Sequence, residues 1–349
     1  MNSVIRTVLS PTATSLISSL SFQSRRVFST SCADFQMGRD NLSLIDKTKH
    51  AKVRLCNVTG YKTDLLEIPA RDPSLHVVFI PGNPGVISFY TDFLESLFEL
   101  LGGTASVTAI GHISHSEKDW ENGRLFSLQE QIDHKASFIE HEFQDVEVPI
   151  ILVGHSIGAY ISLEIFRGSQ EKVIYYIGLY PFLAVNTVSS AQSFIRRFAG
   201  SQFLCAALGS IGGLLGKLPT QISGFVVKNS IGKSWSSSAV VSFCTSVLQY
   251  HTIRNMLFMA MTEFQKLSEK PDWAFMGEKK GQIAFLFSDD DHWGPLHLYE
   301  EIRKQIPNAR VAVEREGNTH AFSCSDAGSL WVAQHVASLI KNCISNSNL

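Results

Sequence analysis

The sequence has few of the features that mark several large classes of protein. Its 30 lysine and arginine residues are not clustered and are balanced by 32 aspartate and glutamate residues, so the net charge is −2. A nucleic-acid binder needs clustered basic residues to contact phosphates, and that class is therefore disfavoured. No apolar run reaches the length of about 18 residues that a membrane-spanning helix requires. At 349 residues the chain is long enough for one large α/β domain with an insertion, or for two ordinary domains.

The cysteines also lack a pattern. They are dispersed along the chain, without a C-x-x-C pair and without histidines at the spacing of a zinc site. We therefore expect reduced thiols, a reducing compartment and no structural metal. The six positions are Cys32, Cys56, Cys205, Cys244, Cys324 and Cys343.

The N-terminal segment differs in composition from the rest. Residues 1–33 contain Arg6, Arg25 and Arg26, many serines and threonines, and no acidic residue. This composition is typical of an organellar transit peptide, and the sequence from Arg26 to Ser29 is similar to a mitochondrial presequence cleavage site. Residues 1–36 are thus predicted to be a targeting leader for a mitochondrion or plastid. A basic leader without function, or translation from Met37, fits the same composition.

The chain is organised around a strand followed directly by a helix. After Pro149, the four apolar residues 150–153 predict a buried strand, and Ile157, Ile161 and Ile165 recur at helical spacing. The strand and helix are separated by Gly154-His155-Ser156-Ile157-Gly158, a Gly-x-Ser-x-Gly motif.

In this context the motif predicts a nucleophile elbow. A sharp turn from strand to helix holds Ser156 in a strained conformation, and a Cβ atom on Gly154 or Gly158 would clash with the turn. The serine hydroxyl is then exposed at the carboxyl end of a strand, beside a helix N-terminus that favours developing negative charge.

Strands and helices alternate along most of the chain, which predicts an α/β fold with a mostly parallel sheet and helices on both faces. The alternation extends over residues 50–181 and 276–345. Between them, residues 182–275 lack it and are predicted to form a helical, Phe-rich cap. Within the cap, residues 203–216 are uncharged and too short to span a bilayer. This run fits a helix in a lipid monolayer, the wall of an acyl pocket, or an ordinary core helix of the cap.

A serine nucleophile requires a base, and the base requires a carboxylate to orient it. In α/β-hydrolases these residues follow the order serine, acid, histidine. Asp291 follows a C-terminal strand and His320 lies in a loop after the last strand, so both are expected at the same sheet edge as Ser156. Asp289 and Asp290 remain alternatives for the acid.

Three other histidines lie near the predicted site. His155, beside the nucleophile, is interpreted as a packing residue that points away from Ser156. His112 and His115 follow the strand that ends near Ile110, and they are expected either to line the pocket or to be exposed.

The oxyanion of an acyl-transfer intermediate requires two backbone N–H donors. Ile157, directly after the serine, supplies the first. Asn83, in the loop Pro81-Gly82-Asn83-Pro84-Gly85, is the candidate for the second. A tight proline turn that only reverses the chain is the alternative.

With these residues in hand, the chain resembles the lipid droplet-associated hydrolase family of the α/β-hydrolase superfamily, over roughly residues 75–340. The resemblance implies an α/β-hydrolase fold, a Ser156, Asp291 and His320 triad, association with lipid droplets and endoplasmic reticulum, and hydrolysis of sterol esters or acylglycerols. The motifs that carry it are Phe79 to Gly85 with Phe89-Tyr90, Val153 to Tyr160, Tyr180-Pro181-Phe182, Asp291 to Pro295, and His320-Ala321-Phe322.

The leading hypothesis is a cofactor-free serine hydrolase that acts on apolar acyl esters, such as a neutral lipid or sterol ester, at lipid droplets. An alternative is a droplet-surface interaction protein with weak or vestigial hydrolase activity, in which the apolar cap carries the function. Thioester hydrolysis or acyl transfer to another alcohol would use the same residues. Protein partners are not predicted.

Overall fold

The computed structural model describes residues 50–144, 147–289 and 291–347. Its centre is one eight-stranded sheet with the strand order β1-β2-β4-β3-β5-β6-β7-β8. The predicted leader, residues 1–36, lies outside the described residues. The strands are β1 Lys52–Val58, β2 Tyr61–Ile68, β3 Leu75–Ile80, β4 Ala105–Ile110, β5 Ile150–His155, β6 Val173–Leu179, β7 Ile283–Ser288 and β8 Arg310–Glu314.

The sheet is mostly parallel, as predicted. β1 and β2 form an antiparallel hairpin, and β2 pairs antiparallel with β4. From β4 to β8 every neighbouring pair is parallel. The carboxyl ends of these strands therefore meet at one edge of the sheet, where loops from distant parts of the sequence come together.

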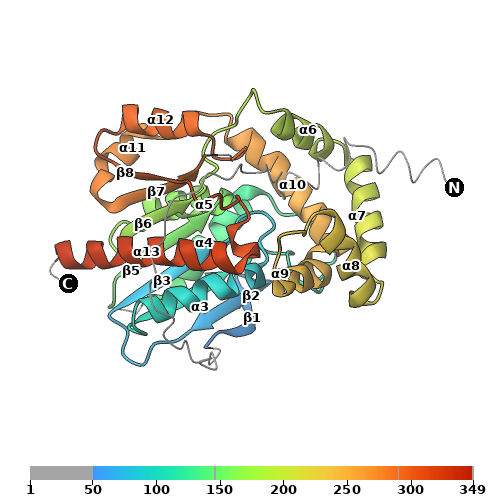
Figure 1. Cartoon of the computed structure of the whole chain (residues 1–349), viewed down its shortest axis with the longest axis horizontal. Helices are drawn as coiled ribbons and strands as arrows, with labels where there is room; N and C mark the ends of the chain where they lie inside the picture. Colours follow the sequence, from blue (N-terminus) through green and yellow to red (C-terminus); the bar gives the residue numbers. More distant parts are fainter. Residues whose placement is uncertain (1–49, 145–146, 290, 348–349) are drawn as a thin grey trace, which may run out of the picture.

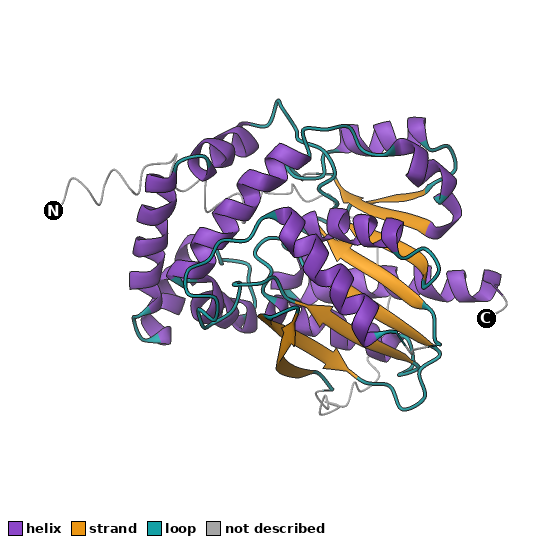
Figure 2. Ribbon diagram, turned by 180° about the vertical axis from the view of Figure 1, so that it is seen from behind, coloured by secondary structure: helices purple, strands orange, loops and turns teal. Residues whose placement is uncertain are grey.

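Helices cover both faces of the sheet (Figure 1, Figure 2). Side chains alternate along β3, so that Val77 and Phe79 pack in the core beside α3 Thr91–Leu100 and α13 Asp326–Ser347. Val78 and Ile80 enter the opposite core, which is covered by α4 Leu128–Glu142, α5 Ile157–Gly168 and α12 Leu296–Gln305. Burial on both faces explains the continuous apolar runs of β3 and β5.

Between β6 and β7 the chain leaves the sheet and forms a group of helices, here called the cap, that occupies the right side of Figure 1. Its long helices are α6 Ser190–Ala199, α7 Gln202–Gly216, α8 Thr220–Ser230 and α10 Tyr250–Lys266. No single helix in the described part of the chain is long and apolar enough to cross a membrane. Helices α6 and α7 together have the length and apolar composition of a membrane span, but the chain bends by 94° between them. The short helices are η1 Ile87–Tyr90, α9 Ser237–Ser242, η2 Phe243–Val247, α11 Trp273–Glu278, η3 Lys280–Gln282 and η4 Phe322–Cys324.

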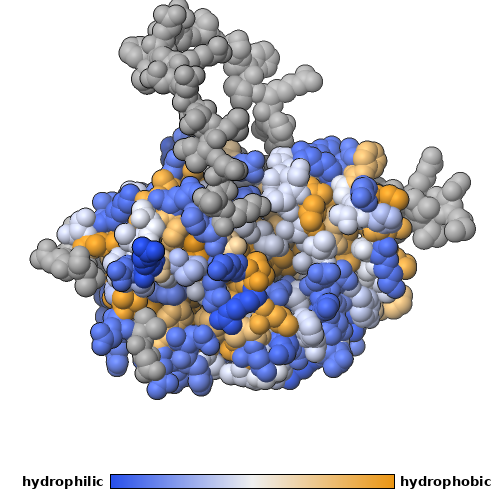
Figure 3. All heavy atoms as spheres, turned by 90° about the horizontal axis from the view of Figure 1, so that it is seen from below, coloured by the Kyte–Doolittle hydropathy of each residue, from blue (hydrophilic) through white to orange (hydrophobic). Residues whose placement is uncertain are grey.

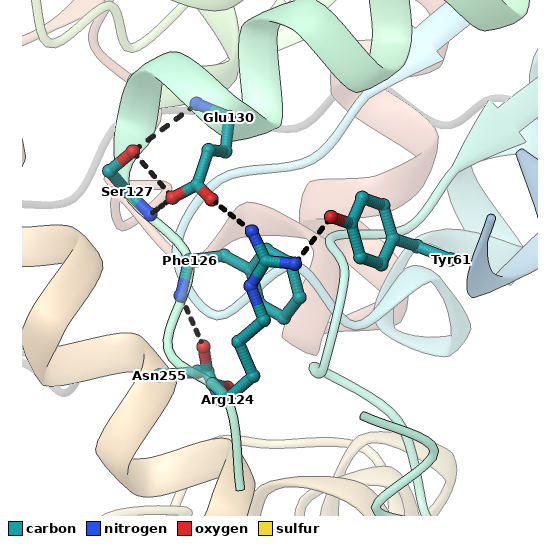
Figure 4. Close-up of polar contacts among 6 residues, drawn as sticks. All are labelled: Tyr61, Arg124, Phe126, Ser127, Glu130 and Asn255. Atoms are coloured by element: carbon teal, nitrogen blue, oxygen red, sulfur yellow. Dashed lines mark hydrogen bonds and ion pairs between the residues drawn. The ribbon is translucent and has the colours of Figure 1, made fainter. Parts of the chain in front are cut away.

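Helix α10 is joined to the sheet domain by a polar cluster around the start of α4 (Figure 4). Asn255 of α10 accepts a hydrogen bond from the Phe126 backbone N–H at 3.0 Å and donates one to the Arg124 carbonyl at 3.0 Å. The Arg124 guanidinium in turn donates to the Tyr61 hydroxyl and pairs with Glu130. The side of α10 that faces the sheet is thereby fixed relative to the core.

Candidate active site

The turn after β5 has the geometry of a nucleophile elbow. Ser156 has φ 56° and ψ −124°, a region that non-glycine residues rarely adopt. A Cβ atom on Gly154 would lie 2.2 Å from the Gly158 carbonyl oxygen, and one on Gly158 would lie 2.3 Å from the Ile80 carbonyl oxygen. The expectation that both positions require glycine is confirmed.

His320 and Asp291 form a direct pair. The Nδ1 atom of His320 lies 2.8 Å from Oδ2 of Asp291, whose side chain is fully buried. The other carboxylate oxygen, Oδ1, accepts a hydrogen bond from the Trp293 backbone N–H at 2.8 Å. Asp289 is exposed, and Asp290 lies outside the described residues. Since the carboxylate occupies Nδ1, the Nε2 atom of His320 is left to exchange a proton with a substrate or nucleophile.

Ser156 and His320 line the same cavity, which has a volume of about 110 Å³. No direct hydrogen bond joins the two side chains in the described structure; such contacts are often long in enzymes without substrate. Most of the cavity wall is apolar, and the remaining polar residues are Asn83 and Glu263. The apolar lining residues are Phe182, Ile195, Met256, Leu257, Ala260 and Trp293.

The loop that follows β3 lies against the elbow. A Cβ atom on Gly82 would be 3.0 Å from the Ser156 Cβ atom. The Asn83 side chain turns to the cap and donates hydrogen bonds to the Met256 carbonyl at 2.9 Å and to Oε1 of Glu263 at 3.0 Å. Within the described residues, no hydrogen bond engages the Asn83 backbone N–H. This arrangement leaves that amide available near Ser156.

A chain of buried hydrogen bonds, which sequence reasoning missed, connects this loop to the His320 loop. The Gly82 N–H donates to the Tyr90 hydroxyl at 3.1 Å, and that hydroxyl lies 2.8 Å from Nδ1 of His155. Nε2 of His155 lies 2.9 Å from the His320 carbonyl oxygen. A carbonyl can only accept, so Nε2 carries the proton and the Tyr90 hydroxyl donates to Nδ1.

Burial, and then the nearby His320, hold the pKa of His155 well below its ordinary value, so its ring is neutral and keeps this order of donors and acceptors. The interpretation of His155 as a packing residue was therefore incomplete. Its ring supports the backbone that carries His320.

We expect Tyr90→Phe to lower kcat by about tenfold. The substitution leaves the buried Gly82 N–H and His155 Nδ1 without their partner, which costs about 1–3 kcal/mol for each unsatisfied group and loosens both loops. Steady-state kinetics together with thermal unfolding would measure the two effects. Tyr175→Phe is the matched control, because its hydroxyl accepts a long hydrogen bond from Arg310, at 3.5 Å, and takes no part in the hydrogen-bond chain from Gly82 to His320. An equal loss of kcat in the control would contradict a specific role for Tyr90.

His112 and His115 do not line the cavity and are not exposed, contrary to expectation. Both are buried behind the loop that follows β3. The His112 ring occupies the space beside Gly85, where a Cβ atom would lie 2.1 Å from the ring, and Nδ1 of His115 accepts from the Gly85 N–H at 3.0 Å. These histidines shape the loop from behind.

The cap helix that lines the cavity is α10, with Ile195 of α6, whereas no residue of α7 lines it. The acyl-pocket interpretation of residues 203–216 is therefore not supported. No local pattern singles out Glu263 or Met256, because their contacts with Asn83 span 180 and 173 positions of the chain.

Comparison with known proteins decides the family. The model of the lipid-droplet associated hydrolase family matches residues 73–323. The chain belongs to the lipid droplet-associated hydrolase family. Members of this family named lipid droplet-associated hydrolase include that of Dictyostelium discoideum, 27% identical over 75% of this chain and 86% of the relative. The rat protein is 26% identical over 82% of this chain and 90% of its own length, and the human protein is 25% identical over 75% and 84%.

Solved structures place this family member in the α/β-hydrolase fold, as predicted. A haloalkane dehalogenase from Agrobacterium tumefaciens aligns with a TM-score of 0.64 at 12% identity, covering 84% of this chain and 97% of its own. An epoxide hydrolase from Vigna radiata aligns at 0.61 and 15%, and an esterase from Thermogutta terrifontis at 0.55 and 14%, each covering 84% of this chain and 99% of its own. Family and fold together support a hydrolase.

Proposed function

We propose that the protein is a cofactor-free serine hydrolase of apolar acyl esters, with Ser156 as nucleophile, His320 as general base and Asp291 as the residue that orients the base. The observation that carries the proposal is the 2.8 Å pair of His320 and buried Asp291 at a cavity shared with Ser156. An imidazole held in this way presents Nε2 to the serine hydroxyl.

The reaction begins when Oγ of Ser156 attacks the ester carbonyl and its proton passes to Nε2 of His320. The negative charge that develops on the carbonyl oxygen is held by the backbone N–H groups of Ile157 and Asn83, each worth about 3–4 kcal/mol in comparable sites. The intermediate then expels the alcohol, which takes the proton back from His320. Water, activated by the same imidazole, releases the acid from Ser156.

A fluorophosphonate probe, which reacts with activated serines, tests this assignment directly. We expect labelling of the wild-type protein and none of Ser156→Ala. Equal labelling of the two proteins would remove Ser156 from the proposed role.

The proposed substrate is a neutral lipid or sterol ester at the surface of lipid droplets. The apolar cavity wall fits an acyl chain. The relatives are named for their association with lipid droplets, and this supports a droplet location over the organellar alternative, whose leader lies outside the described residues.

Helices α7 and α8 carry the surface that we assign to lipid contact. In α7 the small residues face the start of α10 and the turn before it: a Cβ atom on Gly212 would lie 2.1 Å from Ile253 Cδ1 of α10, and one on Gly216 would lie 2.0 Å from the carbonyl oxygen of Leu248, in the turn. The large apolar residues of these helices are exposed. Helices α7 and α8 lie at the right end of the molecule in Figure 1, and Figure 3 shows hydrophobic surface, coloured orange, at that end. This outer face, here called the α7–α8 face, contains Phe203, Ile211, Leu214, Leu218, Ile222, Phe225 and Val226. Exposed apolar groups of this extent are uncommon unless they contact a partner or a membrane.

The charge of the cap matches a lipid surface. Residues 172–262 contain no aspartate or glutamate, whereas Lys217 and Lys228 lie exposed beside the α7–α8 face. Basic residues at the border of an apolar face favour contact with anionic phospholipids.

We expect Leu214→Asp with Phe225→Asp to weaken binding to phospholipid-coated droplets by tenfold or more, because each large apolar side chain contributes about 1.5–3 kcal/mol when removed from water. The two side chains are 65% and 70% exposed, so the fold should tolerate the changes. Flotation of the protein with artificial droplets measures the effect. Leu330→Asp is the control, because this 46% exposed residue lies on α13 and is not part of the α7–α8 face. Unchanged flotation of the double variant would contradict the assignment.

A further inference from the structure

Glu263 is the acidic residue of the cavity wall, and neither the proposed triad nor the oxyanion donors use it. It lies on α10, is 2% exposed, and lines the cavity with Ser156 and His320. Among the described residues that line this cavity, no other side chain carries a carboxyl group. An aliphatic residue would complete the wall without the unfavourable burial of a polar group.

The two carboxyl oxygens of Glu263 have different surroundings. Oε1 accepts the hydrogen bond from Nδ2 of Asn83 at 3.0 Å. Oε2 makes no hydrogen bond with any described residue, and it is the oxygen left for a molecule in the cavity. The need to hold the Asn83 side chain does not by itself explain why a glutamate is present at position 263, because the same Nδ2 atom also donates to the Met256 carbonyl.

Burial raises the pKa of the Glu263 carboxyl to about 8, since the hydrogen bond from Asn83 only partly offsets the loss of solvation. The group is therefore mostly protonated near neutral pH. A protonated carboxyl both donates and accepts a hydrogen bond, and a hydroxyl group is the partner that can do the same in return.

We propose that Glu263 recognises a free hydroxyl group that lies within a few bonds of the scissile ester carbonyl. The expected distance between the hydroxyl group and the ester carbonyl follows from Asn83. Its backbone N–H is the proposed donor to the carbonyl oxygen, and its side chain contacts Glu263. This inference rests on the proposed function and narrows its substrate class to hydroxylated esters, such as partial glycerides or hydroxyacyl esters, with the acyl chain in the apolar part of the cavity.

Two pairs of esters test the inference in the full-length protein, in one detergent at matched concentrations. 1-Monooctanoylglycerol and propyl octanoate differ only by hydroxyl groups on the alcohol, and methyl 3-hydroxyoctanoate and methyl octanoate differ only by one on the acyl chain. We expect wild type to prefer the hydroxylated ester of at least one pair by about tenfold or more in kcat/KM, since a site built to bind a hydroxyl discriminates against its absence. The pair that shows the preference identifies which side of the ester carries the hydroxyl.

The preference should persist in Glu263→Gln, whose amide still donates and accepts, and fall to within about threefold of unity in Glu263→Leu. The ratio of kcat/KM for two substrates, measured on one protein sample, does not depend on how much of the variant is folded. Leu257→Met, an apolar change in the same wall, is the control and should keep the preference.

Absence of a preference in wild type, or its persistence in Glu263→Leu, would overturn the role of Glu263. If fluorophosphonate still labels Ser156 in that case, the proposed serine hydrolase stands and only the substrate class falls. Absence of turnover on all four esters together with absence of labelling would overturn both.

Discussion

Ser156→Ala should lower kcat for ester hydrolysis by a factor on the order of 10⁵ to 10⁶, because removal of a triad serine leaves only the catalysis due to the oxyanion donors and substrate binding. Ser156 is part of the elbow, where its φ angle is 56°, and alanine at this position has to adopt the same strained backbone. The unfolding temperature of the variant must therefore be measured together with its kinetics. The expected result is a folded protein with almost no turnover.

Ser162→Ala is the matched control for this experiment. Ser162 lies in the helix that follows the elbow, is completely buried, and does not line the cavity. We expect it to keep its turnover. Turnover in Ser156→Ala close to wild type would remove Ser156 from the role of nucleophile. Loss of droplet binding on deletion of residues 203–216, with no effect of Ser156→Ala on function in cells, would favour the alternative, a droplet-surface interaction protein with weak or vestigial hydrolase activity.

Asp291→Asn should lower kcat by about 10³ to 10⁴. The asparagine can donate to Nδ1 of His320, which moves the imidazole proton to Nε2 and leaves no acceptor for the proton of Ser156. The Asp291 side chain is fully buried, and its contacts with His320 and the Trp293 N–H fix its position, so an isosteric amide disturbs the chemistry more than the packing.

Asp289→Asn, two positions earlier in the same loop, is the control for Asp291→Asn. Its exposed side chain should tolerate the change with kcat within about twofold of wild type, as surface substitutions away from such features usually do. Both variants are to be measured across pH. At alkaline pH hydroxide can take the proton of Ser156 in place of His320, so the loss of kcat in Asp291→Asn should become smaller. A greater loss of kcat in Asp289→Asn than in Asp291→Asn would reverse the assignment of the acid.

Local sequence pattern was sufficient to predict much of the sheet and the elbow. The apolar runs of β3 and β5 and the glycines beside Ser156 specify their structure within a few residues, and the order of elements then fixes which strand ends share an edge. The same reasoning favoured Asp291 among three adjacent aspartates, and that carboxylate contacts His320 at 2.8 Å.

The contacts that complete the site could not be predicted in this way. Tyr90 meets His155 across 65 positions and Asn83 meets Glu263 across 180, and no periodicity or spacing encodes such pairs. The burial of α7 could not be predicted either. A helix of glycines and large apolar residues can bury either set, depending on which element it packs against. Here the glycines pack against α10, and the large residues are left outside.

Helix α10 has different neighbours along its length. Tyr250 and Ile253, near its start, contact the glycines of α7, while Met256 and Glu263, further along, contact Asn83 and line the cavity. The proposed attachment to a droplet and the proposed ester cleavage are therefore assigned to separate segments of one helix. We expect a variant with a polar α7–α8 face to keep the proposed esterase activity on dissolved substrates. The affinity for droplets and the substrate specificity can then be changed independently of each other.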